Sequence, residues 1–181
     1  MKKIFRGYSR KRIILMISLF ILAVAVVILI CAFTSQNTVT SNMLSRRVSK
    51  AIENFAANFF TVNHEAVFWR KTLNLIVRKL AHFTEYMILG IFVCAFVNVL
   101  LNKFDCLRAA KYTLIGCTAL AITDEFRQWF VPGRTPRLTD ILIDMTGAAL
   151  GIALTTVVYI AIWKMNHPLA ELSFRSGSKQ V

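Results

Sequence analysis

The chain has 181 residues, of which 56% are hydrophobic and 17% charged, and its net charge is +13 at neutral pH. Soluble globular domains contain about 25% charged residues, so the composition argues against a soluble domain and favours a protein that has lipid as its solvent. None of the sequence patterns of DNA-binding or RNA-binding folds is present. We therefore assign the positive charge to the flanks of membrane spans and predict no nucleic-acid partner.

Long uncharged stretches predict where the chain crosses a membrane. No Asp, Glu, Lys or Arg occurs in residues 13–45, 86–102 or 145–163, and a shorter gap covers residues 112–123. Crossing the hydrocarbon core takes about 20 mostly apolar residues. We predict an all-α, polytopic membrane helical bundle with about four transmembrane helices, at 13–33 and at about 82–102, 109–130 and 141–163. A short span at 66–77 would make five.

The first apolar stretch follows six cations in residues 1–12. It is longer than the 7–15 apolar residues typical of a cleaved signal peptide. Residues 1–33 are therefore predicted to form a basic N-terminus and an uncleaved signal-anchor helix.

Residues 34–77 are mixed in character, with Val48, Ile52 and Phe55 at helical spacing beside Lys50 and Glu53. This pattern predicts an extracytoplasmic amphipathic segment that lies on the membrane surface or against the bundle. An ordinary loop helix that packs on a neighbour would give the same pattern.

The distribution of cations predicts the orientation. Four spans place residues 1–12, 102–111 and 164–181 on one side, with 12 Lys and Arg in 40 residues, against 10 in the 69 residues of 34–85 and 124–140. Because Lys and Arg concentrate in cytoplasmic flanks, both termini are predicted to be cytoplasmic, with 164–181 as a cytoplasmic tail of a protein of the bacterial cell membrane.

A first polar cluster precedes the second predicted span. On a helix, Lys79, His82, Glu85 and Tyr86 share one face, and Gly90 continues that face into the bilayer, where a glycine permits close helix approach. Ionisable groups near the hydrocarbon are functional candidates. The alternative is a belt of polar residues that anchors a helix end.

A second cluster ends the third predicted span. Asp124 and Gln128 lie four residues apart on the face that runs back through Cys117 and Ala121, and Glu125 adjoins them. A solvated helix end is the alternative, and it fits Asp124 poorly if this face looks into the bundle.

A third cluster follows a Pro-Gly turn. Arg134 belongs to the connecting segment, and Asp140, Asp144, Gly147 and Gly151 then fall on one face of the last predicted span. Gly147 and Gly151 form a GxxxG pair, which signals close helix packing within an apolar segment. Asp144 is thus predicted to lie at a helix–helix interface.

All three clusters fall at the outer ends of their predicted helices, so we predict that they converge into one polar pocket at the outer leaflet. A structural network of ion pairs is the alternative. No metal or cofactor is indicated, because no HExxH or CxxC pattern occurs. The predicted pocket residues are Lys79, His82, Glu85, Tyr86, Asp124, Glu125, Gln128, Arg134, Asp140 and Asp144.

The strings RKLAHFTEY at 78–86, DEFRQWFVPGR at 124–134 and DILIDMTG at 140–147 resemble the motifs of the VanZ-like membrane protein family. The resemblance covers about residues 72–163, with a three-helix core at 78–163. The sequence departs from the family in two places. Where the family often has a Ser between the Arg and the Asp, this chain has Pro136-Arg137-Leu138-Thr139 before Asp140, and where the last motif commonly has Asn it has Asp144. The resemblance implies a bundle of four or five helices and a link to teicoplanin resistance in Gram-positive bacteria.

Three functions remain open from the sequence. The first is a non-catalytic binding protein in which Lys79, His82 and Arg134 hold an anionic group of a membrane lipid, a lipid-linked cell-wall precursor or a lipoglycopeptide antibiotic. The second is a membrane enzyme acting on a lipid-linked substrate, with His82 as general base and Asp124 and Glu125 as ligands of a divalent ion. The third is a structural or assembly partner within the membrane, or a small carrier.

Overall fold

The computed structural model describes residues 9–34, 38–58, 67–101, 105–131 and 137–166. These residues form helices and no strand, which confirms the predicted all-α class. In chain order the helices are α1 (Arg10–Thr34), α2 (Thr38–Ala57), α3 (Val67–Leu101), α4 (Cys106–Gln128) and α5 (Leu138–Asn166).

Three of these helices are long and apolar enough to cross a membrane: α1, residues 71–101 of α3, and α5. They correspond to the first, second and fourth predicted spans. The 23 residues of α4 would reach about 35 Å, but polar residues lower its mean hydropathy. Whether α4 crosses the membrane, as predicted for residues 109–130, is therefore not decided by its length and hydropathy.

The helix that contains the second predicted span begins earlier than that span. α3 begins at Val67, well before residue 82, and continues unbroken to Leu101. The stretch at 66–77, considered as a short fifth span, is instead the beginning of this one helix from Val67 onward. The cations in residues 70–79 do not end the helix, because Lys and Arg have high helix propensity.

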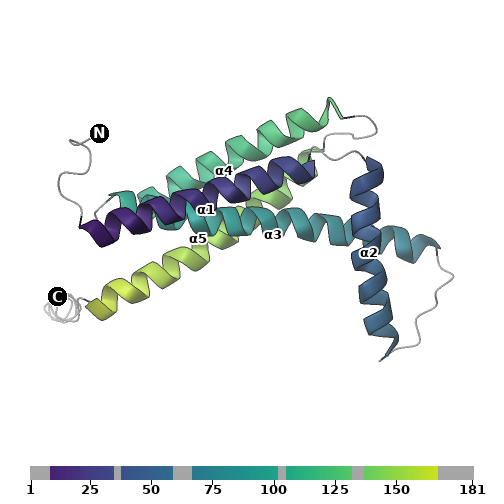
Figure 1. Cartoon of the computed structure of the whole chain (residues 1–181), viewed down its shortest axis with the longest axis horizontal. Coiled ribbons are helices and arrows are strands. Elements are labelled where there is room, and N and C mark those ends of the chain that lie inside the picture. The colour runs from purple at the N-terminus through teal and green to yellow at the C-terminus, as the bar shows by residue number, and fades with distance from the viewer. Residues whose placement is uncertain (1–8, 35–37, 59–66, 102–104, 132–136, 167–181) are drawn as a thin grey trace, which may run out of the picture.

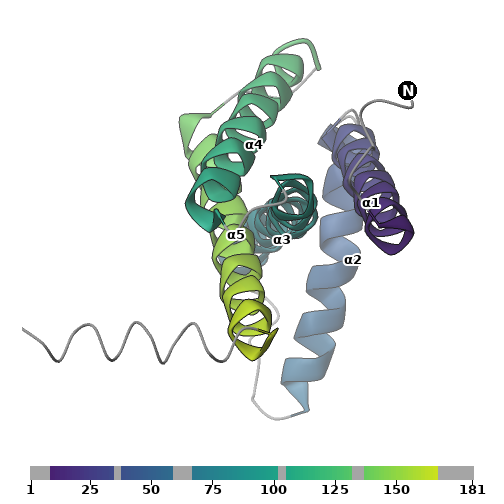
Figure 2. The same ribbon diagram turned by 90° about the vertical axis from the view of Figure 1, so that its left-hand side faces the viewer.

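α3 is the central helix, and it contacts each of the other four. Figure 2 shows α1 on one side of it and α4 with α5 on the other. The start of α1, the end of α3, the start of α4 and the end of α5 lie at one end of the bundle, while α2 lies across the opposite end (Figure 1). We call the end covered by α2 the α2 end.

Glycines bring α3 and α5 together. A Cβ atom added at Gly90 would lie 2.6 Å from the carbonyl oxygen of Ala148, closer than real Cβ atoms come to any neighbour. Gly147 and Gly151 likewise face the carbonyl oxygens of Phe83 and Met87. Two backbones that approach this closely exclude any side chain, as at small-residue interfaces in membranes.

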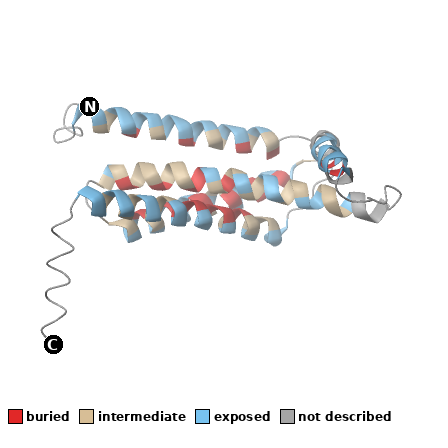
Figure 3. Ribbon diagram, turned by 90° about the horizontal axis from the view of Figure 1, so that it is seen from below, coloured by how far each residue is buried: buried red, intermediate tan, exposed pale blue. Residues whose placement is uncertain are grey.

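Buried residues lie where α3, α4 and α5 face one another, and the outward faces are exposed (Figure 3). Many exposed side chains are large and apolar, among them Ile14, Phe20, Ile115 and Val157. An apolar exterior of this extent is expected of a protein whose surroundings are lipid.

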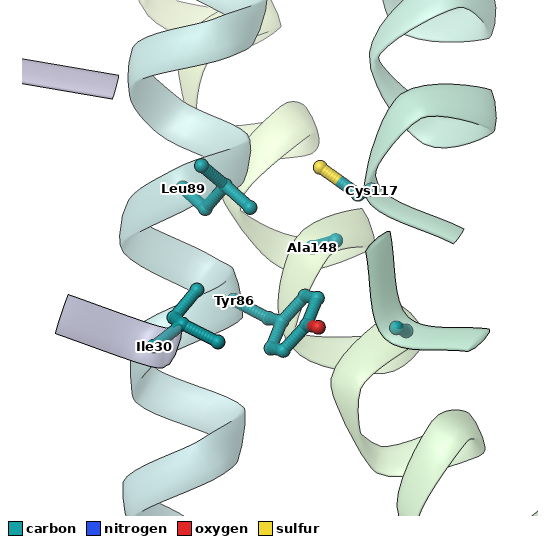
Figure 4. Close-up of a cluster of buried hydrophobic side chains, with 6 residues drawn as sticks. Ile30, Tyr86, Leu89, Cys117 and Ala148 are labelled. Carbon is teal, nitrogen blue, oxygen red and sulfur yellow. The ribbon is translucent and has the colours of Figure 1, made fainter. Parts of the chain in front are cut away.

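The apolar core sits in the middle of the bundle. Ile30 of α1, Tyr86 and Leu89 of α3, Cys117 of α4 and Ala148 of α5 pack together there (Figure 4). Helices from both sides of α3 therefore meet at the level of Tyr86, the residue that also borders the polar clusters.

Candidate functional site

The polar clusters gather at the α2 end of the bundle, where α1 and α4 end and α5 begins (Figure 1). On α4, residues four apart line the inner face, and Asp124 and Gln128 continue the buried stripe of Cys117 and Ala121. Asp124 is only 3% exposed, and Glu125 is buried beside it. The helix therefore turns its acids inward, and a solvated helix end does not describe this arrangement.

The α3 side of the site consists of His82, Glu85 and Tyr86. His82 Nδ1 lies 3.5 Å from Glu85 Oε2 within the same helix, a pair that is ionic when the imidazole is protonated. Tyr86 is fully buried, and its ring extends from α3 towards α4 and α5 (Figure 4).

An ion pair joins α3 to α5 at the edge of the site. Lys79 Nζ lies 3.4 Å from Asp140 Oδ1, with both side chains partly exposed. One turn further along α5, Asp144 is 4% exposed. α5 thus places one acid at the edge of the site and one in its interior.

The connection from α4 to α5 is held by Glu125. Its Oε2 accepts a hydrogen bond of 3.0 Å from the backbone N–H of Arg137, which precedes α5. Arg127 Nη1 lies 3.9 Å from Asp124 Oδ1. The predicted site residue Arg134 lies outside the described residues.

The structure brings the three predicted clusters together. Asp144 interacts electrostatically with His82 of α3 and with Asp124 of α4. Tyr86 interacts electrostatically with both Asp144 and Asp124. Gln128 is buried on the inner face of α4. Side chains that are 62 residues apart, such as His82 and Asp144, share one site because α3 and α5 approach at their glycines.

Four buried oxygens in this site have no hydrogen-bond partner among the described residues. They are Glu85 Oε2 and Tyr86 Oη of α3, Asp124 Oδ1 of α4 and Asp144 Oδ1 of α5. Buried polar atoms are normally hydrogen-bonded, and each exception calls for a reason. Oxygens of this kind can accept hydrogen bonds from amine, amide or hydroxyl groups of a ligand.

One contributor was not predicted from the sequence. Thr34, the last residue of α1, is buried. Its hydroxyl group donates to the Ile30 carbonyl within α1 and lies close to the Asp124 carboxylate. The sequence offers no signal for this contact, because a Thr at the end of an apolar run looks like an ordinary helix terminus. The predicted signal-anchor helix therefore also contributes to the site.

Within the described residues, no group of three or more His, Cys, Asp or Glu side chains is arranged to hold a metal ion. The divalent ion that the enzyme hypothesis placed at Asp124 and Glu125 has no third such ligand in this part of the chain. The described side chains of the site supply hydrogen-bond acceptors and charge.

An apolar exterior around a buried cluster of acids, on helices long enough to cross the bilayer, defines a helical membrane protein with a polar interior site. The sequence profile of the VanZ/LLP1 family matches residues 19–161, well over half of the chain, and the chain belongs to this family. No curated protein and no solved structure shows significant similarity to it.

The family assignment confirms the resemblance read from the motifs and widens it. The match begins within α1 and ends within α5, whereas the motifs covered only about residues 72–163. Both α1 and α2 thus belong to the family region, in agreement with the position of Thr34 beside Asp124.

Proposed function

We propose that this VanZ-like protein is a non-catalytic binding protein of the cell envelope, and that it holds a lipid-linked cell-wall precursor or a lipoglycopeptide at the outer leaflet. The observation that carries the proposal is the set of four buried oxygens, contributed by three helices, that have no hydrogen-bond partner among the described residues. Two of them have only longer ion-pair contacts, Glu85 Oε2 at 3.5 Å from His82 and Asp124 Oδ1 at 3.9 Å from Arg127. A ligand rich in amine, amide and hydroxyl donors matches these acceptors. Both ligand classes carry such donors.

The cations would hold the anionic part of the same ligand. Lys79 lies at the edge of the site, where it pairs with Asp140, and its side chain is 41% exposed. Its ammonium group can therefore leave Asp140 and bind a phosphate or carboxylate of a ligand instead. His82, and Arg134 in the segment before α5, would complete this anionic subsite.

We also infer that α4 is the fourth span. Its inner stripe carries the polar side chains, and its exposed face carries Leu107, Ile115, Ile122 and Phe126. A helix of this kind keeps its acids inside the bundle and turns apolar groups towards lipid. Its exposed cations Arg108, Lys111 and Arg127 lie near its two ends, where long side chains can reach the headgroup level.

The fourth span and the orientation are tested together by labelling. Single cysteines introduced as Asp105→Cys and Val131→Cys in a chain without its native cysteines flank α4. An impermeant maleimide added to intact cells should label position 131 and leave position 105 unlabelled. Labelling of both positions from outside would show that α4 does not cross.

Binding is tested by antibiotic susceptibility in a sensitive Gram-positive host, with teicoplanin beside vancomycin. Wild type should protect selectively against teicoplanin. Tyr86→Phe is the sharpest variant, because it removes a hydroxyl group that has no partner among the described residues and leaves the packed ring. A binding role predicts loss of protection at an unchanged protein level, whereas a purely structural role predicts no effect.

Asp124→Asn and Asp144→Asn should also lose protection, because an amide presents one acceptor oxygen instead of two. Asp105→Asn is the matched control, since Asp105 caps α4 at the opposite end of the bundle and Asn caps helices equally well. Protein levels are compared by immunoblot. Full protection by Tyr86→Phe, Asp124→Asn and Asp144→Asn would contradict the proposal.

A further inference from the structure

A second site lies far from the acid cluster, between the first half of α4 and the middle of α5. It is a groove of about 1110 Å³. Three alanines line it, Ala110 of α4 with Ala149 and Ala153 of α5, and their small side chains leave space between the two helices. Leu114 and Ile115 add apolar walls.

The groove is open to the surroundings of the bundle. Leu107 and Ile115, which line it, are 81% and 61% exposed. From Asp105 to Ile115 the groove follows α4 for about 15 Å, half of a hydrocarbon core of about 30 Å. Its length therefore matches the depth of one leaflet.

The charges of the groove lie at one end. Arg108 Nε pairs with Asp105 Oδ2 at 3.0 Å, so these two side chains compensate each other. Lys111 also lines the groove, and no carboxylate among the described residues pairs with it. This end of the groove, which we call its mouth, therefore carries one positive charge that no carboxylate among the described residues compensates. A long Lys side chain can extend from apolar surroundings to the headgroup level.

This mouth lies at the basic end of the bundle. α4 begins where α1 begins (Figure 1), and the Arg12 guanidinium donates to the Val99 carbonyl close to the end of α3, with its Nε at 3.0 Å. Arg10 and Lys11 add further cations to the same end. A basic end of a membrane protein faces the leaflet whose surface carries anionic lipid.

We propose that the groove between α4 and α5 binds an anionic phospholipid, with an acyl chain along Ala110, Ala149 and Ala153 and the phosphate at Lys111. The positive mouth selects the anionic headgroup, and the apolar length selects a lipid over a soluble anion. This site is independent of the acid cluster at the α2 end.

The experiment measures lipid binding to the purified full chain in neutral detergent, by native mass spectrometry and by the shift of its thermal unfolding temperature. The probes are phosphatidylglycerol, phosphatidylcholine with the same acyl chains, and inorganic phosphate. Phosphatidylglycerol should bind about five-fold more tightly than phosphatidylcholine, since a Lys near an anionic lipid surface contributes an effect of this size. Inorganic phosphate should leave the unfolding temperature unchanged.

Two variants separate the headgroup from the chain. Lys111→Gln should remove the preference for phosphatidylglycerol. The double variant Ala149→Leu with Ala153→Leu should lower the binding of both lipids, because its side chains fill the groove. The matched controls are Lys11→Gln, a cation of α1 at the same end, and Ala161→Leu, an exposed alanine of α5 outside the groove; both should bind like wild type.

The proposal is overturned if the two phospholipids bind equally to wild type, if Lys111→Gln keeps the preference, or if inorganic phosphate alone stabilises the protein. It is also overturned if the leucine variant changes the oligomeric state and not lipid binding, because the groove would then hold a second copy of the chain. Should the leucine variant fail to fold, Lys111→Gln decides, since it alters only an exposed side chain.

Discussion

α3 makes two unlike interfaces with the helices on its two sides. Against α5, the glycines Gly147 and Gly151 place backbone against backbone, at the carbonyl oxygens of Phe83 and Met87. Against α1, the contact is narrow. The buried apolar residues of α1 are Met16, Ala23 and Ile30, which are spaced seven apart, and we call this line of residues the seam.

The two interfaces differ in how firmly they hold the residues of the site. In lipid, helices associate through close packing and interhelical hydrogen bonds, because burial of apolar surface gains little there. The glycine interface supplies such packing along α3 and α5, the helices that carry His82 and Asp144. The seam of α1 supplies less, although α1 brings Thr34 to Asp124.

The largest expected effect comes from breaking the glycine interface. Gly151→Ala would place a methyl group against the Met87 carbonyl oxygen, and the two backbones would have to separate. We expect the free energy of unfolding to fall by about 3 kcal/mol, the upper range for overpacking. Denaturation in SDS followed by circular dichroism measures it. If Gly151→Ala lowered the free energy of unfolding by less than Met16→Ala of α1, the interface with α5 would be the weaker of the two.

The seam should tolerate loss better. Met16→Ala removes a side chain that is 7% exposed between α1 and α3. We expect a loss of about 1 kcal/mol, below the values for soluble cores because lipid replaces the lost contacts in part. The same SDS titration measures it, and a loss equal to that of Gly151→Ala would make α1 part of the central packing unit.

A glycine outside both interfaces provides the control. Apart from its chain neighbours and the backbone of α4 itself, no atom of the described residues lies within 4 Å of a Cβ added at Gly116. Gly116→Ala should therefore stabilise the protein by about 0.7 kcal/mol, because alanine loses less conformational entropy in a helix. If Gly116→Ala also destabilised the protein, the loss in Gly151→Ala could not be attributed to the contact between α3 and α5.

The smallest effect on stability is expected at the edge of the site. Lys79→Ala breaks the pair with Asp140, in which the side chains are 41% and 23% exposed. A pair this exposed contributes about 0.4 kcal/mol, so unfolding should barely change. If antibiotic protection nevertheless falls, Lys79 contributes through binding; an unfolding loss comparable to Gly151→Ala would assign it a structural role.

Helical spacing alone predicts much of this arrangement. Asp140, Asp144, Gly147 and Gly151 lie on one face because their spacings match the helical repeat, and Asp124 is buried as its stripe predicts. These inferences use residues within one helix, where the geometry follows from sequence separation.

The remaining features depend on contacts between distant segments. Thr34 lies beside Asp124 although the two are 90 residues apart in the sequence. Nothing in the sequence around either residue predicts that contact. The start of α3 at Val67 also escaped prediction, because the cations before His82 indicate a membrane boundary but do not end a helix. The amphipathic pattern of α2 predicts that the helix lies on a surface or against a neighbour, but it does not say which neighbour. That neighbour is α3.

The inward-facing acids of α4, the proposed fourth span, also bear on how the chain enters the membrane during synthesis. A segment with Asp124, Glu125 and Arg127 near its end is a poor substrate for insertion by itself, since each charged residue opposes transfer into lipid. We expect α4 to enter together with α5, as a hairpin in which the backbone N–H of Arg137 already reaches Glu125, while Thr34 of α1 and His82 of α3 meet Asp124 once the bundle forms. α4 would then be a helix whose place in the membrane is decided by its neighbours.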